Sequence, residues 1–194
     1  MIRILDVFFA LIGLLILLPL ILIISCILLF DPYGKILFRQ KRVGLNGKEF
    51  TIYKFRTMVN KGTYKYHLTV ASDSRITPFG SVLRKWKLDE IPQFINVIKG
   101  DMSIVGPRPE VSAYTKLYSE EQKKVLTVKP GITDYASIAF SNEESMLKNA
   151  GDPEKYYIDH IMPRKIKLNM NYINNRSISN YFRIILLTVK TLLK

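Results

Sequence analysis

Cysteine and histidine are scarce in this sequence of 194 residues, which has one Cys and two His. The lone Cys26 excludes an intramolecular disulfide, and a zinc site of His and Cys ligands is excluded as well. Acidic residues are also few, because 16 Asp and Glu stand against 29 Lys and Arg and give a formal net charge of +13. We therefore expect anionic partners, such as phosphorylated small molecules or acidic lipid head groups. Nucleic acid is not an expected partner, since no recognition motif for it is present.

Charge is absent altogether from residues 7–30, VFFALIGLLILLPLILIISCILLF. The run exceeds the roughly 20 apolar residues that cross a bilayer, and it has no small-residue cleavage site, so we expect a retained membrane segment. Pro19, near its middle, predicts a kink or a break. Basic residues flank both ends, which places both on the cytoplasmic side. A helical hairpin satisfies these observations, and a single kinked span is an equal alternative on physical grounds.

Short motifs predict the elements that follow. Asn46-Gly47, between two runs rich in apolar and β-branched residues, predicts a β-hairpin. Thr77-Pro78 predicts an N-cap with proline at the first helical position. A second helix is expected over residues 90–99, where apolar positions follow a 3.6-residue period and a glycine comes directly after.

The rest of the chain completes a fold that we expect to be α+β and mostly helical. Residues 60–74 are polar and irregular, which indicates a surface loop. Residues 179–194, SNYFRIILLTVKTLLK, are typical of a basic amphipathic helix that lies on a membrane surface. The expected result is a compact domain with a small β-hairpin, anchored by the membrane segment and by amphipathic helices at the interface.

Two adjacent carboxylates, Asp89 and Glu90, lie in the stretch KLDEIPQFINVIKGDMSIVGPRPE, residues 87–110. Asp89 stands where the second helix would begin, and aspartate is among the best N-caps, so a structural role is a direct alternative to a functional one. Pro92 weakens the capping role, because it has no N–H to donate. Bases surround the pair: Arg84, Lys85, Lys87 and Arg108, with Lys54 and Arg56 at a strand end.

Carboxylates among many bases suit a phosphorylated substrate that binds with Mg²⁺. Magnesium takes one or two protein carboxylates, here Asp89 and Glu90, together with phosphate oxygens, and cations neutralise the remaining charge. An aspartate can also attack phosphorus itself and form an acyl phosphate. Neighbouring cations would keep that aspartate ionised.

Several motifs occur in a fixed order: FRQKRVG at 38–44, YKFRTM at 53–58, SDSRITPFGSVLRKWKLDEIPQFINVIKGDMSIVGPRP at 72–109 and KPGIT at 129–133. In these motifs the chain resembles the bacterial sugar transferase family, the monotopic phosphoglycosyl transferases that start glycan assembly on polyprenyl phosphate. The resemblance extends from the apolar segment to about residue 135. The extra N-terminal transmembrane domain of larger members is absent from the sequence, so the chain resembles a small, minimal form.

The resemblance implies a re-entrant membrane helix broken at Pro19, which favours the hairpin over the single span. It also implies that the protein is monotopic in the bacterial inner membrane, with its catalytic domain on the cytoplasmic face. We therefore expect a membrane helix-hairpin over residues 1–34, a catalytic domain over 35–160 and a basic amphipathic segment over 161–194. Membrane lipids are then partners, and a homo-oligomer stays an open alternative.

The reaction that the resemblance implies moves a sugar 1-phosphate from a UDP-sugar to polyprenyl (undecaprenyl) phosphate with release of UMP. This would be the first membrane step of polysaccharide or glycoconjugate biosynthesis. By the match, Asp89 is the nucleophile that forms a phosphosugar-aspartyl intermediate, while Glu90 helps to hold Mg²⁺ and orients the site. The implied substrate-binding residues are Arg84 and Arg108, with Lys54 and Arg56 as further assignments for which surface charge is the alternative.

The chain departs from the family pattern at two positions. Leu18 stands where many members have serine before the helix-breaking proline, which affects the local geometry of the break. Asp134 follows KPGIT where many members have glycine, and the region 134–147 that it opens bears on sugar choice, so no particular sugar is assigned.

Other hypotheses are compatible with parts of this pattern. A basic membrane-surface adaptor that binds acidic lipids or a partner protein would explain the charge and the amphipathic C-terminus. It gives no reason for the Asp89-Glu90 pair or for the Pro-Arg-Pro element. A one-step transfer, in which Asp89 only binds metal, would keep the fold and change the mechanism.

Overall fold

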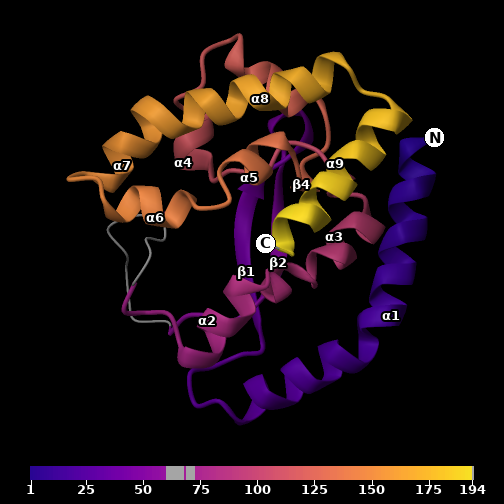
Figure 1. Ribbon diagram of the computed structural model, residues 1–194, viewed down its shortest axis with the longest axis vertical. Coiled ribbons are helices and arrows are strands. Elements are labelled where there is room, and N and C mark those ends of the chain that lie inside the picture. Colours follow the sequence, from indigo (N-terminus) through magenta and orange to yellow (C-terminus); the bar gives the residue numbers. More distant parts are fainter. Residues whose placement is uncertain (60–67, 69–72, 194) are drawn as a thin grey trace.

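The computed structural model describes residues 1–59, 68 and 73–193 (Figure 1). The segment 60–74, expected to be an irregular loop, therefore lies largely outside the described residues. In chain order the helices and strands are α1 (Ile2–Phe30), β1 (Leu37–Val43), β2 (Glu49–Phe55), α2 (Pro78–Lys85), α3 (Gln93–Lys99), β3 (Ser103–Val105), α4 (Ser112–Thr115), β4 (Gly131–Thr133), α5 (Tyr135–Ala139), α6 (Glu143–Lys148), α7 (Pro153–Tyr156), α8 (Met162–Asn174) and α9 (Ile178–Leu192). The described residues are mostly helical, which confirms that part of the expected fold.

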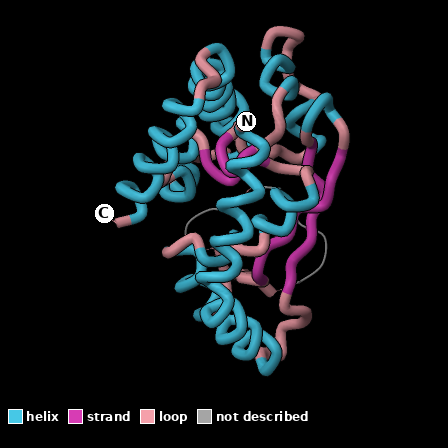
Figure 2. The backbone as a smooth tube through the Cα atoms, turned by 90° about the vertical axis from the view of Figure 1, so that its right-hand side faces the viewer, coloured by secondary structure: helices cyan, strands magenta, loops and turns pink. Residues whose placement is uncertain are grey.

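The predicted hairpin is present. Strands β1 and β2 pair antiparallel from Leu37 opposite Phe55 to Val43 opposite Glu49, and they run side by side along one edge of the molecule (Figure 2). The turn between them uses positive φ at two neighbouring residues, 54° at Asn46 and +75° at Gly47. Asparagine and glycine adopt this conformation most readily, so the Asn-Gly prediction is confirmed together with its physical reason.

Helix α1 remains helical through Pro19. Figure 1 shows that it bends, so that its two halves follow different sides of the domain, and an internal proline is a usual cause of such a bend. The predicted break therefore takes the form of a bend in a continuous helix. Among the described residues, α1 is a helix that is long and apolar enough to cross a membrane.

Both halves of α1 pack against the domain. In the first half, Ala10 is fully buried in a cluster with Val97 of α3 and Met102. In the second half, Leu28 is fully buried in a cluster with Phe55 and Leu83. The helix is thus a part of the folded core as well as an apolar surface element.

A buried carboxylate fixes the start of α1. Asp6 accepts hydrogen bonds from the Ser103 hydroxyl at 2.8 Å, the Ile104 amide at 2.9 Å and the Tyr181 hydroxyl at 3.0 Å. Arg3 donates to the carbonyl oxygen of Ile98 at 2.9 Å. These contacts join α1 to β3, α9 and the end of α3, and they hold the membrane-segment helix and the C-terminal helix together.

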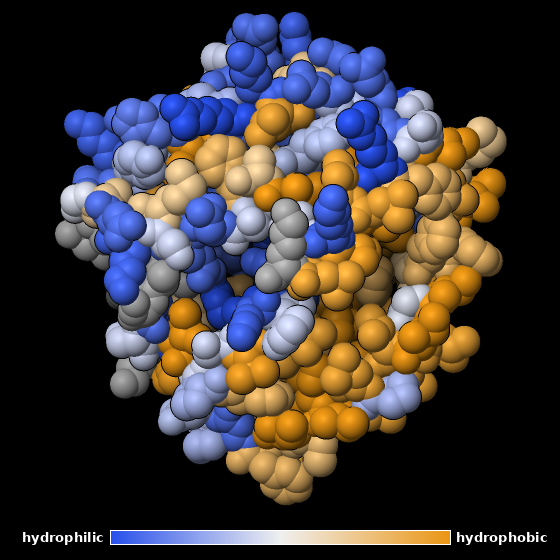
Figure 3. Space-filling model, in the orientation of Figure 1, coloured by the Kyte–Doolittle hydropathy of each residue, from blue (hydrophilic) through white to orange (hydrophobic). Residues whose placement is uncertain are grey.

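The outward surfaces of α1 and α9 are apolar. Figure 3 shows hydrophobic residues gathered over the lower right of the molecule, while hydrophilic residues cover its top and left. The exposed members include Leu15, Ile16, Leu22, Leu29 and Phe30 on α1, and Leu186 and Val189 on α9. A continuous exposed apolar surface of this kind marks a contact with membrane or with another protein.

The C-terminal residues fold as predicted into an amphipathic helix, α9. Helix α8, which precedes it, shares a core with the rest of the domain: Met162 and Ile166 lie in one cluster with Val111 and Tyr114. The division of the chain into segments 1–34, 35–160 and 161–194 stays a prediction, and the last of these segments is joined to the second by this shared core.

Candidate active site

Asp89 and Glu90 lie in a short 3-10 turn, Leu88–Glu90, which follows Lys87 in the left-handed region at φ 55°. Helix α3 begins only at Gln93, and no side chain caps it. The prediction that Asp89 caps a helix over residues 90–99 is therefore wrong. An N-cap at Asp89 would accept from the amide of Ile91 or of Pro92, but Pro92 has no N–H, and the amide of Ile91 bonds the carbonyl of Leu88 at 3.3 Å, which tightens the turn.

The two carboxylates are buried. Asp89 is 5% exposed and Glu90 is 8% exposed. Among the described residues no hydrogen-bond partner reaches the buried Oδ1 atom of Asp89. A buried carboxylate oxygen without a partner is rare in folded proteins and requires an explanation, of which a ligand is one. The absence of a capping role leaves this oxygen available for chemistry.

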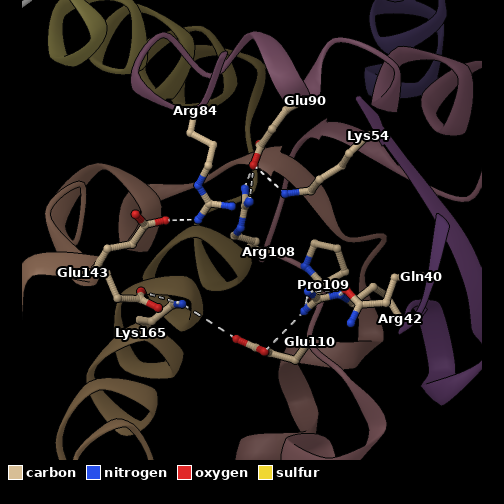
Figure 4. Close-up of polar contacts among 11 residues, drawn as sticks. Gln40, Arg42, Lys54, Arg84, Glu90, Arg108, Pro109, Glu110, Glu143 and Lys165 are labelled. Atoms are coloured by element: carbon tan, nitrogen blue, oxygen red, sulfur yellow. Dashed lines mark hydrogen bonds and ion pairs between the residues drawn. The ribbon is translucent and has the colours of Figure 1, made fainter. Parts of the chain in front are cut away.

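Glu90 is held by two cations, which Figure 4 shows converging on its carboxylate. Lys54, at the end of β2, donates to Oε1 at 2.9 Å. Arg108, in the Pro-Arg-Pro loop, donates to Oε2 at 3.0 Å and also forms an ion pair with Oε1. Three predicted site residues from separate parts of the sequence are thus brought into direct contact.

Burial and these contacts shift the pKa values of the two carboxylates in opposite directions. Burial alone would raise the pKa of Glu90, but Arg108 and Lys54 outweigh it and hold the pKa well below its usual value. Burial raises the pKa of Asp89; Lys54 opposes this rise, and the charge of Glu90 adds to it. Glu90 therefore stays ionised as the partner of two cations, and Asp89 is the more easily protonated member of the pair.

Arg84, in the last turn of α2, reaches across to another carboxylate. Its guanidinium forms an ion pair with Glu144 of α6. Arg84, Glu90 and Arg108 all line one cavity of about 820 Å³, which Figure 3 shows as a hydrophilic hollow on the left of the molecule. Asp89 and Lys54 do not line it and lie next to residues that do. The structure thus collects anion-binding groups at a cavity large enough for a nucleotide sugar.

Arg56 lies apart from this group. Its guanidinium donates to the carbonyl of Lys35 at 2.9 Å and of Leu28 at 3.3 Å, and it forms an ion pair with Asp31 at 3.4 Å. These contacts give hydrogen-bond donors to carbonyl groups at the end of α1 and in the segment after it. The substrate-binding role assigned to Arg56 stays a prediction, and its observed contacts are structural.

Two glycines hold the Pro-Arg-Pro loop against the KPGIT segment. Strand β3 pairs parallel with β4, and Gly106 donates to the carbonyl of Thr133 at 3.0 Å, while Gly131 donates to the carbonyl of Pro107 at 3.0 Å. A Cβ on Gly131 would lie 2.1 Å from the Gly106 nitrogen, so a side chain would not fit. Two of the sequence motifs are therefore packing partners, and their contact sets the position of Arg108.

Asp134, which follows the KPGIT segment, is fully buried. Its carboxylate accepts a hydrogen bond from the backbone amide of Arg108 at 2.9 Å and caps α5 through the amide of Ser137. The departure from the family pattern therefore has a structural function: it ties the Arg108 loop to the start of the segment that follows.

Glu143, Glu144 and Lys165 all line the cavity. The sequence did not single out any of them as a site residue, although the first two lie in the region 134–147 that was connected with sugar choice. Lys165 of α8 bonds Glu143 at 3.0 Å and approaches Glu110 at 3.7 Å, the residue after Pro-Arg-Pro (Figure 4). The adjacent acidic pair Glu143-Glu144 was a local signal for a polar surface. Nothing near Lys165 in the sequence marked it, because its partners come from distant segments.

A buried carboxylate pair beside convergent cations, at a cavity, has the features of an enzyme active site. The chain belongs to the bacterial sugar transferase family, a family of enzymes, which it matches over residues 1–194. This membership favours the enzyme hypothesis over the adaptor.

Similar proteins differ in length and in the sugar that they name. The chain is 40% identical over 158 residues to the "Uncharacterized sugar transferase EpsL" of Bacillus subtilis (strain 168), covering 81% of this chain and 70% of that protein. It is 39% identical over 191 residues to the "UDP-glucose:undecaprenyl-phosphate glucose-1-phosphate transferase" of Xanthomonas campestris pv. campestris, covering 94% and 37%. It is 33% identical over 192 residues to the "UDP-N-acetylgalactosamine-undecaprenyl-phosphate N-acetylgalactosaminephosphotransferase" of Aeromonas hydrophila, covering 97% and 42%. The chain thus spans less than half of the two longer relatives.

Proposed function

We propose that this protein transfers a sugar 1-phosphate from a UDP-sugar to polyprenyl phosphate and releases UMP, as an early membrane step of polysaccharide or glycoconjugate synthesis. The observation that carries the proposal is the buried Asp89-Glu90 pair, with an unpartnered Asp89 oxygen beside Lys54 and Arg108. The relatives named as UDP-sugar:undecaprenyl-phosphate transferases support the choice of donor and acceptor.

In the proposed reaction Asp89 is the nucleophile. Its ionised carboxylate oxygen attacks the phosphorus that carries the sugar, a bond from aspartate to phosphorus forms, and the bond between the two phosphates breaks as UMP leaves. A phosphate oxygen of the polyprenyl phosphate then attacks the same phosphorus. The aspartyl bond breaks, the carboxylate is restored, and the product is a polyprenyl diphosphate sugar.

The cations have separate tasks in this scheme. Arg84 and Arg108 line the cavity and would balance the diphosphate charge as it develops on the leaving group. Lys54 lies beside the carboxylates and favours the ionised form of Asp89. Glu90 holds Lys54 and Arg108 in place, so it acts chiefly as the organiser of the cations.

The residues present could supply one or two carboxylate ligands to the proposed Mg²⁺. Among the described residues no group of three or more His, Cys, Asp and Glu side chains could hold a metal. Magnesium commonly needs only one or two protein carboxylates when substrate phosphates complete its shell. The free Oδ1 of Asp89 suits this role, and Glu90 would join it by giving up a contact with a cation. When bound, the metal would neutralise charge on the diphosphate.

The apolar faces of α1 and α9 support a monotopic placement. We propose that α1 enters the membrane, bends near Pro19 and returns, so that the cavity faces the head groups on the cytoplasmic side of the inner membrane. The bend, the basic flanks and the shared exposed apolar surface of the two helices favour this arrangement.

The test is UMP release by the purified protein in detergent with Mg²⁺, a UDP-sugar panel and polyprenyl phosphate. Asp89→Asn should reduce turnover by on the order of 10³-fold or more, as removal of a nucleophile does. Asp159 has an exposed carboxylate just before α8 and does not line the cavity, so Asp159→Asn is the matched control and should keep wild-type turnover. Full activity in a folded Asp89→Asn variant would overturn the nucleophile assignment.

A second measurement separates the two-step from the one-step route. The enzyme is mixed with a donor labelled in the sugar phosphate, without acceptor, and denatured. Label should remain on wild-type protein and be absent from Asp89→Asn. Label on neither protein, together with normal turnover of the wild type, would favour direct transfer.

A further inference from the structure

The wall of the cavity that faces Arg84 has no task in the proposed chemistry. We call it the polar wall, and its members are Ser137, Ser141, Asn142, Glu143, Glu144 and Ser145. The segment runs from α5 to α6 and offers hydroxyl, amide and carboxylate groups. Such groups bind the hydroxyls of a sugar, because they can both accept and donate hydrogen bonds.

The polar wall lies next to Arg84, one of the two cations that would bind the phosphates of the donor. Glu144, a member of the wall, forms an ion pair with Arg84, so the wall directly contacts this cation. In a nucleotide sugar the hexose is bonded directly to the second phosphate. A donor whose diphosphate is held by Arg84 and Arg108 must therefore place its sugar beside the wall.

Lys165 fixes one end of the wall. It is 9% exposed, and its ammonium contacts Glu143 at 3.0 Å, the Tyr157 hydroxyl at 3.5 Å and Glu110 at 3.7 Å. Burial would lower the pKa of Lys165, but Glu110 and Glu143 outweigh it and raise the pKa, so the ammonium keeps its charge. The charge of Glu143 is thus permanently matched by a buried cation.

Ser137 fixes the other end. Its Oγ atom is buried and has no hydrogen-bond partner among the described residues, although Ser137 lines the cavity. Its backbone amide is held by Asp134, which also holds the amide of Arg108. The unpartnered hydroxyl therefore has a fixed position relative to the phosphate-binding loop.

We propose that the polar wall is the sugar subsite, and that it selects a sugar without a carboxylate over a uronic acid. This inference rests on the proposed function and deepens it. When the diphosphate takes Arg84, Glu144 loses its cation while Glu143 keeps Lys165, so the wall becomes negative by one charge. Neutral hydroxyls can donate to Glu144, whereas a carboxylate on the sugar is repelled by it.

The experiment compares kcat/KM for UMP release with UDP-glucose, UDP-galactose, their N-acetylamino counterparts and UDP-glucuronate. The best uncharged donor should exceed UDP-glucuronate by about tenfold or more in the wild type. In Glu144→Gln, which keeps size and removes charge, this ratio should fall by about tenfold. Glu120 has a side chain that is 90% exposed and pairs with the nearby Lys123 on the surface, so Glu120→Gln is the control and should keep the ratio.

The ratio is diagnostic because a purely structural role would not change it. Freeing Arg84 or loosening α6 changes kcat/KM for all UDP-sugars by the same factor, and the ratio between two donors cancels that factor. A Glu144→Gln protein that melts like wild type and keeps the wild-type ratio would overturn the sugar subsite, as would a wild type that prefers UDP-glucuronate. If no donor released UMP from the wild type, the proposed function itself would fail, which is a separate outcome.

Discussion

Lys54 and Glu90 form a partly buried ion pair with Nζ and Oε1 2.9 Å apart, next to Asp89. Among the charged neighbours of Asp89, Lys54 is the one that most strongly opposes the rise in pKa caused by burial. A residue at the end of the hairpin strand β2 thus sets the ionisation of a carboxylate in the turn before α3. The hairpin has a part in the proposed chemistry as well as in the fold.

Replacing Lys54 with methionine should move the acid limb of activity to higher pH. Burial raises the pKa of Asp89 and Lys54 lowers it, so loss of Lys54 raises it further. Because the nucleophile must be ionised, kcat/KM in Lys54→Met should fall more steeply below neutral pH than in the wild type and recover in part as pH rises. The pH profile of kcat/KM for UMP release measures this effect.

Lys48→Met is the matched control, since Lys48 is an exposed residue of the same hairpin. Its acid limb should coincide with that of the wild type. An acid limb in Lys54→Met that is unchanged or moves to lower pH would contradict the role given to Lys54. A uniform loss of activity at every pH would indicate a structural role only.

Removal of the Asp134 carboxylate should damage stability and activity together. Asp134→Ala loses the cap of α5, for about 0.5–2 kcal/mol, and leaves the amide of Arg108 without its acceptor. We expect kcat/KM to fall by about tenfold or more, because the loss of a buried hydrogen bond loosens the Arg108 loop. Thermal unfolding and UMP release measure the two effects on the same sample.

Asp152 offers a control for the stability that is lost when a helix cap is removed. Its carboxylate caps α7 through the amides of Glu154 and Lys155, and among the described residues it forms no hydrogen bond or ion pair with the Arg108 loop. Asp152→Ala should therefore lose a similar amount of stability and keep its kcat/KM. If both variants lost activity in proportion to stability, Asp134 would be only a cap.

The features that could be predicted from sequence rest on local chemistry. The turn at Asn46-Gly47 and the cap at Thr77 depend on residues within a few positions, and both are present. The helix expected over residues 90–99 begins only at Gln93: Pro92 offers no N–H to a cap at Asp89, and the amide of Ile91 bonds the carbonyl of Leu88.

The cavity shows where local reasoning ends. Glu90, Arg84 and Arg108 were identified from motifs, but the residues of the opposite wall were not. Glu144 meets Arg84, and Lys165 meets Glu110, only after the intervening chain has folded, and no short-range pattern encodes such contacts. The structural role of Asp134 also became visible only with its partner, the amide of Arg108.

Adding a methyl group at Gly131 should break the contact between the two motif segments. The Cβ would lie 2.1 Å from the nitrogen and 2.4 Å from the oxygen of Gly106, so the backbone must move. Gly131→Ala should lose at least about 1–3 kcal/mol, as overpacked sites do. For a chain of this size that corresponds to a fall in Tm of roughly 2–12 °C, with loss of UMP release because Arg108 is displaced. Gly151, where a Cβ would meet nothing within 4 Å, is the control, and Gly151→Ala should keep both Tm and turnover. An unchanged Tm in Gly131→Ala would mean that the packing of these two segments does not position the site.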